Sequence, residues 1–288
     1  MLVHPDCAPC LLRRVLFQAR LAGNGSESDA VSAAVRKYAE ALSPGVCSTD
    51  IATAVHRAAY AAMGVEDPYL GLKIRSEEVA ERLLPAAEGY IESADDRLAA
   101  AAKVAIAGNV MDFGSGISID DPDLFSSELD GLLAEGIPGG GMAAFEAMLS
   151  SSQRVLYALD NCGEDVFDKP LIREIRSRGK EVIGVAKGAP VLNDVTLPDA
   201  ARIGLDREMD GIVGAGGFAV GLPADFSAEL SEAASSADML LSKGMANYES
   251  LSSRPIGLPT AFLLRAKCIP VAGSIGVPVG TSVVHCVP

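Results

Sequence analysis

The feature of this sequence that most constrains its fold is a series of short apolar runs, which alternate with helix-like segments from about residue 104 onward. The runs are VAIAG (104–108), RVLYALD (154–160), EVIGVAK (181–187), GIVGAG (211–216), DMLLSKG (238–244), AFLLRAK (261–267) and SVVHCV (282–287). Strands that are apolar along their whole length are typical of a sheet buried on both faces, and amphipathic segments such as 169–179 supply the covering helices. The pattern predicts a three-layer α/β domain with a mostly parallel sheet over residues 101–288.

The first hundred residues have a different texture. Between residues 8 and 103 apolar side chains recur three and four positions apart, with no β-rich stretch between them. This period is that of an amphipathic helix. Residues 1–100 are therefore predicted to form an N-terminal helical domain that precedes the α/β domain.

Charge and hydropathy exclude several classes of function. The chain has a formal net charge of −14, and sequence-independent nucleic-acid binding needs an excess of Lys and Arg, so no nucleic-acid partner is expected. No uninterrupted apolar run reaches the roughly 18 residues of a membrane-spanning helix, so no membrane partner is expected. The segment MLVHPDCAPC lacks the basic and apolar regions of a secretory signal, which predicts a cytoplasmic protein.

Polar side chains gather where five of the predicted strands end. They are Asn109 and Asp112; Asp160, Asn161 and Glu164; Lys187, Asn193 and Asp194; Lys243, Asn247 and Glu249; and Lys267. Asp-Asn pairs are common turn formers, so one such cluster alone indicates little. Open α/β sheets, however, bind ligands outside the carboxyl ends of their strands, so five clusters predict a polar active site at that edge.

The residue types at this edge favour a divalent cation and a phosphate. Two carboxylates and an amide carbonyl make an oxygen-rich donor set, which suits Mg²⁺ or Mn²⁺ better than Zn²⁺. Lysines at neighbouring strand ends would serve as point charges for phosphate oxygens. A cation and two or three of these lysines would together make a local positive patch inside an acidic protein.

The motifs that carry these residues resemble the metal-dependent damage-control phosphatases, the DUF89 family. The resemblance runs over nearly the whole chain, through DCAPC (6–10), GNVMDFG (108–114), DNCGEDVFDK (160–169), KGAPVLNDVT (187–196), SKGMANYE (242–249) and LLRAKC (263–268). It implies a helical domain packed on an α/β domain, and hydrolysis of a phosphate ester with bound Mn²⁺, Mg²⁺, Co²⁺ or Ni²⁺. The Cys-x-x-Cys of DCAPC resembles the prokaryotic branch of that family.

The resemblance also implies roles for individual residues. Asp160, Asn161 and Asp194 match the metal-binding positions. Segment 245–249 matches a substrate loop, in which Asn247 and Tyr248 are the strongest matches, and Lys267 matches the lysine of the terminal motif. The eukaryotic branch has Arg-Thr-x-Lys there, whereas this chain has LRAK (264–267), so that branch's substrate range does not carry over.

The remaining strand-end residues are assigned from chemistry. Lys187, Asn193 and Lys243 are predicted to contact the substrate. A metal-oriented water is the favoured nucleophile, with Asp112 or Glu164 as its proton acceptor and Asn109 holding the phosphate or the water. An aspartyl phosphate formed on Asp160 is the alternative. Expected substrates are small phosphorylated metabolites: sugar phosphates, damaged phosphometabolites or nucleotides.

Three further features leave alternatives open. Cys7 and Cys10 fit simple helix packing, a second metal site completed by another Cys, or a redox pair. GAGGFA (214–219) fits the loose dinucleotide-binding pattern of an NAD(P)-dependent oxidoreductase, but Pro223 delays the next helix to about residue 226, which weakens that fit. A non-catalytic metal- or phosphometabolite-binding protein is the other alternative. His56 is expected to be a partly exposed surface residue, and the sequence leaves the oligomeric state open.

Overall fold

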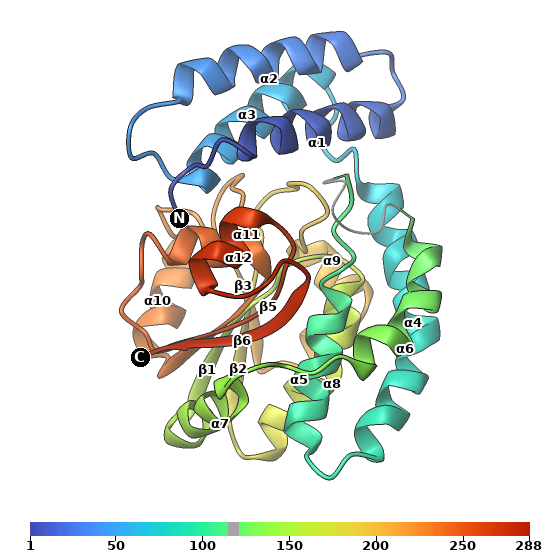
Figure 1. Ribbon diagram of the computed structural model, residues 1–288, viewed down its shortest axis with the longest axis vertical. Coiled ribbons are helices and arrows are strands. Elements are labelled where there is room, and N and C mark those ends of the chain that lie inside the picture. The colour runs from blue at the N-terminus through green and yellow to red at the C-terminus, as the bar shows by residue number, and fades with distance from the viewer. Residues whose placement is uncertain (115–120) are drawn as a thin grey trace.

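A computed structural model describes residues 1–114 and 121–288 of the chain (Figure 1). The chain begins with five helices, which are α1 (Cys7–Ala22), α2 (Glu27–Ala41), α3 (Ser48–Met63), α4 (Leu70–Glu92) and α5 (Arg97–Gly108). Apolar residues spaced three and four apart bury one side of α1 to α4, as Val15 and Ala19 do on α1. The predicted helical start of the chain is confirmed.

The predicted strand at residues 104–108 is wrong, because this run is the last part of α5. Asp96 begins the helix by accepting a hydrogen bond from the backbone N–H of Ala99, and the Ala-rich run that follows has a high helix propensity. A short apolar run that is buried all round has the same appearance in a buried helix and in a buried strand. In α5 all residues of 104–108 are buried.

The remaining apolar runs form one sheet of six strands. They are β1 (Arg154–Ala158), β2 (Glu181–Ala186), β3 (Gly211–Gly214), β4 (Met239–Lys243), β5 (Thr260–Ala266) and β6 (Thr281–Val287). The strand order is β3-β2-β1-β4-β5-β6, with every neighbouring pair parallel except the antiparallel pair of β5 and β6. The mostly parallel sheet is confirmed.

Helices cover both faces of this sheet (Figure 1). The helices after β1 and between later strands are α8 (Glu164–Ser177), α9 (Leu197–Arg202), α10 (Ala228–Ser236), α11 (Gly244–Leu251) and α12 (Ile269–Ile275), while α6 (Phe125–Ala134) and α7 (Gly141–Ser151) precede β1. Side chains alternate along β1: Val155 and Tyr157 belong to the core shared with α5 and α8, whereas Leu156 and Ala158 belong to the core shared with α10, α11 and α12. The predicted three layers are present.

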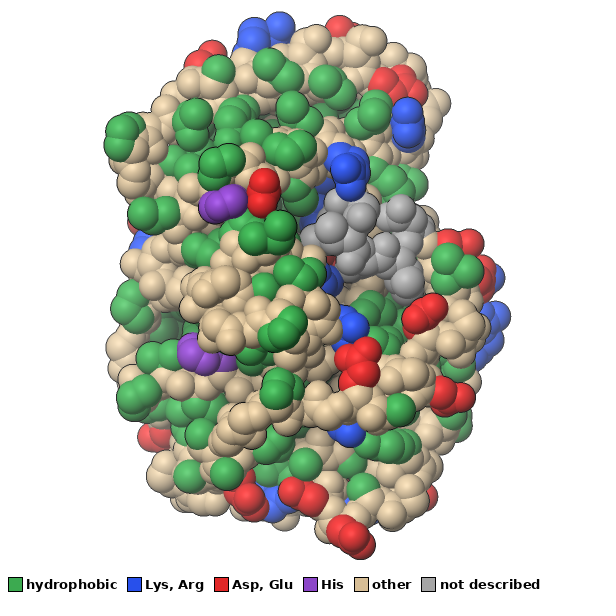
Figure 2. Space-filling model, viewed as in Figure 1, with side chains coloured by type: hydrophobic (Ala, Val, Ile, Leu, Met, Phe, Trp, Pro, Cys, Tyr) green, Lys and Arg blue, Asp and Glu red, His purple; other side chains and the backbone are tan. Residues whose placement is uncertain are grey.

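The helical part of the chain is divided between two locations. Helices α1 to α3 pack on one another at one end of the molecule, whereas α4 and α5 pack against α8 beside the sheet (Figure 1). The boundary at residue 100 therefore remains a prediction. On the face shown in Figure 2, Lys and Arg side chains are visible between the α1–α3 end and the rest of the molecule. In the described parts of the chain, no helix is long and apolar enough to cross a membrane.

Candidate active site

The candidate site lies where the order of the strands reverses. The chain runs from β1 outward through β2 and β3, then returns to the other side of β1 for β4, so the carboxyl ends of β1 and β4 flank the switch point. Asp160 follows β1 and Gly244 follows β4. A Cβ at Gly244 would lie 1.8 Å from Asp160 Oδ2, and the φ of Gly244 is 73°, so both space and backbone conformation require glycine here.

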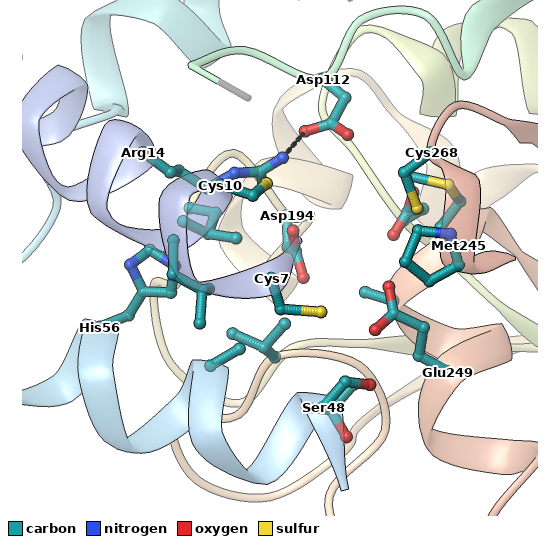
Figure 3. A pocket seen from close by; sticks show the side chains of 18 of the residues that line it. Cys7, Cys10, Arg14, Ser48, His56, Asp112, Asp194, Met245, Glu249 and Cys268 are labelled. Atoms are coloured by element: carbon teal, nitrogen blue, oxygen red, sulfur yellow. Dashed lines mark hydrogen bonds and ion pairs between the residues drawn. The ribbon is translucent and has the colours of Figure 1, made fainter. Parts of the chain in front are cut away.

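A cavity opens at this point, between the sheet edge and the α1–α3 end (Figure 3). Predicted site residues that line it are Cys7, Cys10, Asp112, Asp160, Asn161 and Asp194. Helices α1 and α3 contribute one side, and Met245, Glu249 and Cys268 stand across from them in Figure 3. The site is therefore shared between the helical end of the chain and the sheet.

Asp160 is the centre of a crowded group of carboxylates. Its Oδ2 accepts hydrogen bonds from Asn109 Nδ2 at 3.0 Å and from Asn161 Nδ2 at 2.7 Å. Burial, and then the negative charges of Glu164 and Asp194, raise the pKa of Asp160 well above its usual range. An isolated β-bridge between Asn161 and Asp194 holds the two motifs together.

Asp112 forms ion pairs with two basic side chains. Arg14 Nη2 donates to Asp112 Oδ1 at 2.7 Å, and Lys267 Nζ donates to Asp112 Oδ2 at 2.8 Å and to the Asn109 carbonyl oxygen at 2.8 Å. Burial alone would raise the pKa of Asp112, but the two positive charges outweigh it and hold the pKa at about 2. Asp112 is therefore a carboxylate at any working pH.

Asp194 is paired with Lys187. The Lys187 Nζ lies 3.2 Å from Asp194 Oδ2, close enough for an ion pair, although that oxygen accepts no aligned hydrogen bond. Lys187 donates instead to the Gly221 carbonyl oxygen at 2.6 Å. Burial raises the pKa of Asp194, and Lys187 offsets part of that effect. One oxygen of Asp194 therefore remains available to a ligand.

Lys243 lies behind the cavity and is not among the residues that line it. It is fully buried, and its Nζ lies 2.6 Å from both Glu164 Oε1 and Asp168 Oδ1. Glu164 is also fully buried, with its Oε2 bound by Asn109 and Asn161. Lys243 and Glu164 therefore form a buried ion pair that supports the amides around Asp160.

Three other residues that were predicted to contact the substrate form hydrogen bonds within the protein. Asn193 donates to the Met111 carbonyl oxygen at 2.8 Å, and Asn247 donates to the carbonyl oxygens of Leu159 and Lys243. The Tyr248 hydroxyl lies 2.8 Å from Ser274 Oγ, and its ring packs on Phe262 in the other core of the sheet. None of the three is among the cavity-lining residues.

The sequence prediction left Arg14 and His56 out of the site, although both line the cavity. Arg14 lies on α1, one turn beyond Cys10 and two turns beyond Cys7, so the helical spacing of these three residues is a signal that places them on one face. His56 on α3 was expected to be a partly exposed surface residue, and this prediction is wrong. The side chain is fully buried and lines the cavity. Burial, and then the Arg14 charge, lower the pKa of His56 to about 3, so its imidazole is neutral.

Cys7 and Cys10 lie at the start of α1, and both line the cavity together with Cys268. All three thiols are free, and burial raises the pKa of each, to about 12 for Cys268. Since the thiolate is the reactive form, these cysteines are poor nucleophiles at neutral pH.

We expect Cys7 and Cys10 to react with iodoacetamide at pH 7.5 at least about tenfold more slowly than glutathione, because their thiolate forms are disfavoured. The rate should rise steeply between pH 8 and 10, and peptide mass spectrometry identifies the alkylated residue. Rapid alkylation at pH 7 would show a stabilised thiolate and favour the redox interpretation.

A separate group of potential ligands lies outside the predicted metal set. Ligand atoms of Glu77, Cys162 and Asp165 lie within 4.8 Å of one another, and all three residues are buried. Arg202 binds both oxygens of Glu77, at 2.6 and 2.8 Å, so much of this cluster's negative charge is already neutralised.

GAGGFA follows β3, as expected, and the helix after it is delayed. Helix α10 begins at Ala228, with Ser227 accepting a hydrogen bond from the backbone N–H of Leu230. A Cβ at Gly188 would lie 1.4 Å from the Gly216 carbonyl oxygen, so this loop packs directly on the KGAP turn. The segment lacks the helix N-terminus that would bind a dinucleotide phosphate.

Comparisons with known proteins agree on one family. The sequence model of the damage-control phosphatase ARMT1-like domain matches residues 3–283. A damage-control phosphatase of Archaeoglobus fulgidus is 37% identical over 287 residues, covering 98% of both chains. Damage-control phosphatase PH1575 of Pyrococcus horikoshii is 34% identical over 230 residues, covering 78% of this chain and 76% of its own. The crystal structure of a DUF89 family protein from Pyrococcus horikoshii superposes with a TM-score of 0.87 at 27% identity, covering 99% of both chains.

Proposed function

The chain belongs to the damage-control phosphatase ARMT1-like (DUF89) family, and from this premise we propose that it hydrolyses phosphate monoesters of small metabolites with the help of a divalent cation. The single observation that carries the proposal is the meeting of Asp160, Asn161 and Asp194 in one cavity at the switch point of the sheet. Damaged phosphometabolites are the substrates that the names of the relatives favour.

The residues present fit a hard divalent cation. Asp160 and Asp194 are buried, and the negative charge of Asp194 is among the causes that raise the pKa of Asp160. A cation between the two carboxylates would relieve this repulsion, and the side-chain oxygen of Asn161 would complete an oxygen donor set. Mn²⁺, Mg²⁺, Co²⁺ and Ni²⁺ are all compatible with such ligands.

When bound, a divalent cation polarises a phosphoryl oxygen and neutralises developing charge. The chain's own residues orient the remaining groups. Asn109 and Asn161 fix the Asp160 carboxylate, and the Lys243–Glu164 pair fixes those amides from behind. Lys187 and Lys267 hold Asp194 and Asp112 in place and add positive charge close to the cavity.

Asp112 is the stronger candidate for accepting the proton of an attacking water, because it lines the cavity and Glu164 does not. Its low pKa makes it a weak base but keeps it ionised and ready to accept a hydrogen bond. Attack by water avoids using Asp160 both as a metal ligand and as a nucleophile. Asn109 acts in this scheme by positioning Asp160 rather than by contacting the phosphate.

The experiment is release of inorganic phosphate from a panel of sugar phosphates, nucleotides and pantetheine phosphate. Protein stripped with EDTA should retain less than about 1% of the activity, since removing a catalytic metal costs several kcal/mol of transition-state stabilisation. Adding Mg²⁺, Mn²⁺, Co²⁺ or Ni²⁺ should restore turnover. Full activity after stripping would contradict the metal-assisted mechanism, while no turnover with any metal would favour a binding protein.

A further inference from the structure

Three buried polar side chains, on α1, on α3 and just before α4, have no hydrogen-bond partner among the described residues. They are Gln18 at both amide atoms, His56 at both ring nitrogens and Tyr69 at its hydroxyl. Each is fully buried. Buried polar groups are nearly always paired, so one that is unpaired and also lines a cavity indicates a ligand or ordered water.

His56 is the member of this set that lines the cavity, and it lies near Arg14. Both are cavity-lining residues, and the Arg14 charge contributes to the lowered pKa of His56. Figure 3 shows the two on the same side of the cavity, with Met245, Glu249 and Cys268 on the other. Helices α1 and α3 thus present a cation and a neutral imidazole to whatever enters.

Among the described residues, Arg14 is the one Lys or Arg that lines the cavity, beside the carboxylates Asp6, Asp112, Asp160, Asp194 and Glu249. Its hydrogen bond to Asp112 uses one of five N–H donors. A guanidinium held in this way has donors left for phosphate oxygens. Arg14 is therefore placed to bind the phosphoryl group that the metal ligands face.

The neutral imidazole of His56 offers one N–H donor and one acceptor. A hydroxyl group is likewise both a donor and an acceptor, so it can satisfy His56 without introducing a charge. A purely apolar group at this position would leave both ring nitrogens unpaired, and sites built to bind a hydroxyl reject analogues that lack it.

We propose that Arg14 and His56 form a substrate subsite, in which Arg14 binds the phosphoryl group and His56 binds a hydroxyl on the alcohol portion of the ester. This rests on the proposed phosphatase function. The helical end of the chain then selects esters whose alcohol carries a further hydroxyl, while the sheet edge performs the hydrolysis.

The test compares alkyl phosphates of three to six carbons with and without additional hydroxyl groups, such as glycerol 3-phosphate against propyl phosphate. The wild-type kcat/KM for the best hydroxylated ester should exceed that for its deoxy analogue at least about tenfold. His56→Phe keeps an aromatic ring and removes both nitrogens, so it should abolish this preference and leave the deoxy ester within about twofold. His285→Phe, a histidine on β6 outside the cavity, is the matched control and should keep the preference.

Arg14→Gln should lower kcat/KM for both esters of a pair by a similar factor, because they share the phosphate. A wild-type enzyme that discriminates less than threefold, or a His56→Phe protein that keeps the full preference, would overturn the inference. An equal loss for both esters in His56→Phe would also overturn it, by assigning His56 a structural role. Failure of the wild type to hydrolyse any ester with any metal would instead overturn the proposed function.

Discussion

The Asp160→Asn protein should lose about 10³-fold in phosphate release while remaining as stable as the wild type, because it removes a metal-binding charge from a place where charge is unfavourable. The pKa of Asp160 is raised by burial and by neighbouring carboxylates, so the ionised side chain costs stability in the metal-free protein. The amide keeps the size of the carboxylate, and its oxygen can still accept from Asn109 and Asn161. Turnover with each metal and urea unfolding in EDTA measure the two effects.

The matched control for this variant is Asp95→Asn, an exposed carboxylate between α4 and α5 that should change neither quantity. Loss of both activity and several kcal/mol of stability in Asp160→Asn would contradict the account, since it would make Asp160 a structural residue. Retention of more than about a tenth of the activity would remove Asp160 from the metal site.

The Lys243→Met protein should be destabilised by about 3–5 kcal/mol, because it leaves the carboxylates of Glu164 and Asp168 buried without their cation. Burial raises the pKa of Asp168 to about 6, although the charge of Lys243 acts to lower it. A carboxyl group whose pKa is raised on folding favours the folded state when protonated, so stability is lost as the pH rises through that pKa. The deficit should therefore be larger at pH 8 than at pH 5.

Urea unfolding of Lys243→Met at several pH values tests this, with Lys37→Met as the control. Lys37 forms an exposed pair with Glu40, and its removal should change the free energy of unfolding by less than about 0.5 kcal/mol. Adding Asp168→Asn to Lys243→Met should restore part of the stability. Unchanged stability with a raised KM would show instead that Lys243 contacts the substrate, as its position at the end of a strand predicts.

Most of the fold follows from the sequence because strand and helix periods differ. The apolar runs that follow residue 150 are strands, and the polar residues after β1 and β2 meet at one edge because parallel strands point the same way. The run at 104–108 fails this reasoning, since a helix buried all round loses its period.

The site is less predictable than the fold, because strand-end position does not specify the direction of a side chain. Lys243 is the last residue of β4 and Asp160 comes just after β1, yet Lys243 is fully buried and pairs with Glu164. Arg14 and His56 enter the site through the packing of α1 and α3 over the sheet edge, which local sequence does not encode. Helical spacing from Cys7 to Arg14 was the available signal.

The measurement that tests the central claim most directly is a titration of metal-free protein with Mn²⁺, followed by electron paramagnetic resonance, with phosphate release assayed on the same samples. The account predicts that turnover rises in parallel with the first Mn²⁺ bound per chain, and that Asp194→Asn weakens both together. Turnover that is already complete without Mn²⁺, or that does not change as Mn²⁺ binds, would contradict the assignment of Asp160, Asn161 and Asp194 as the metal site of a phosphatase.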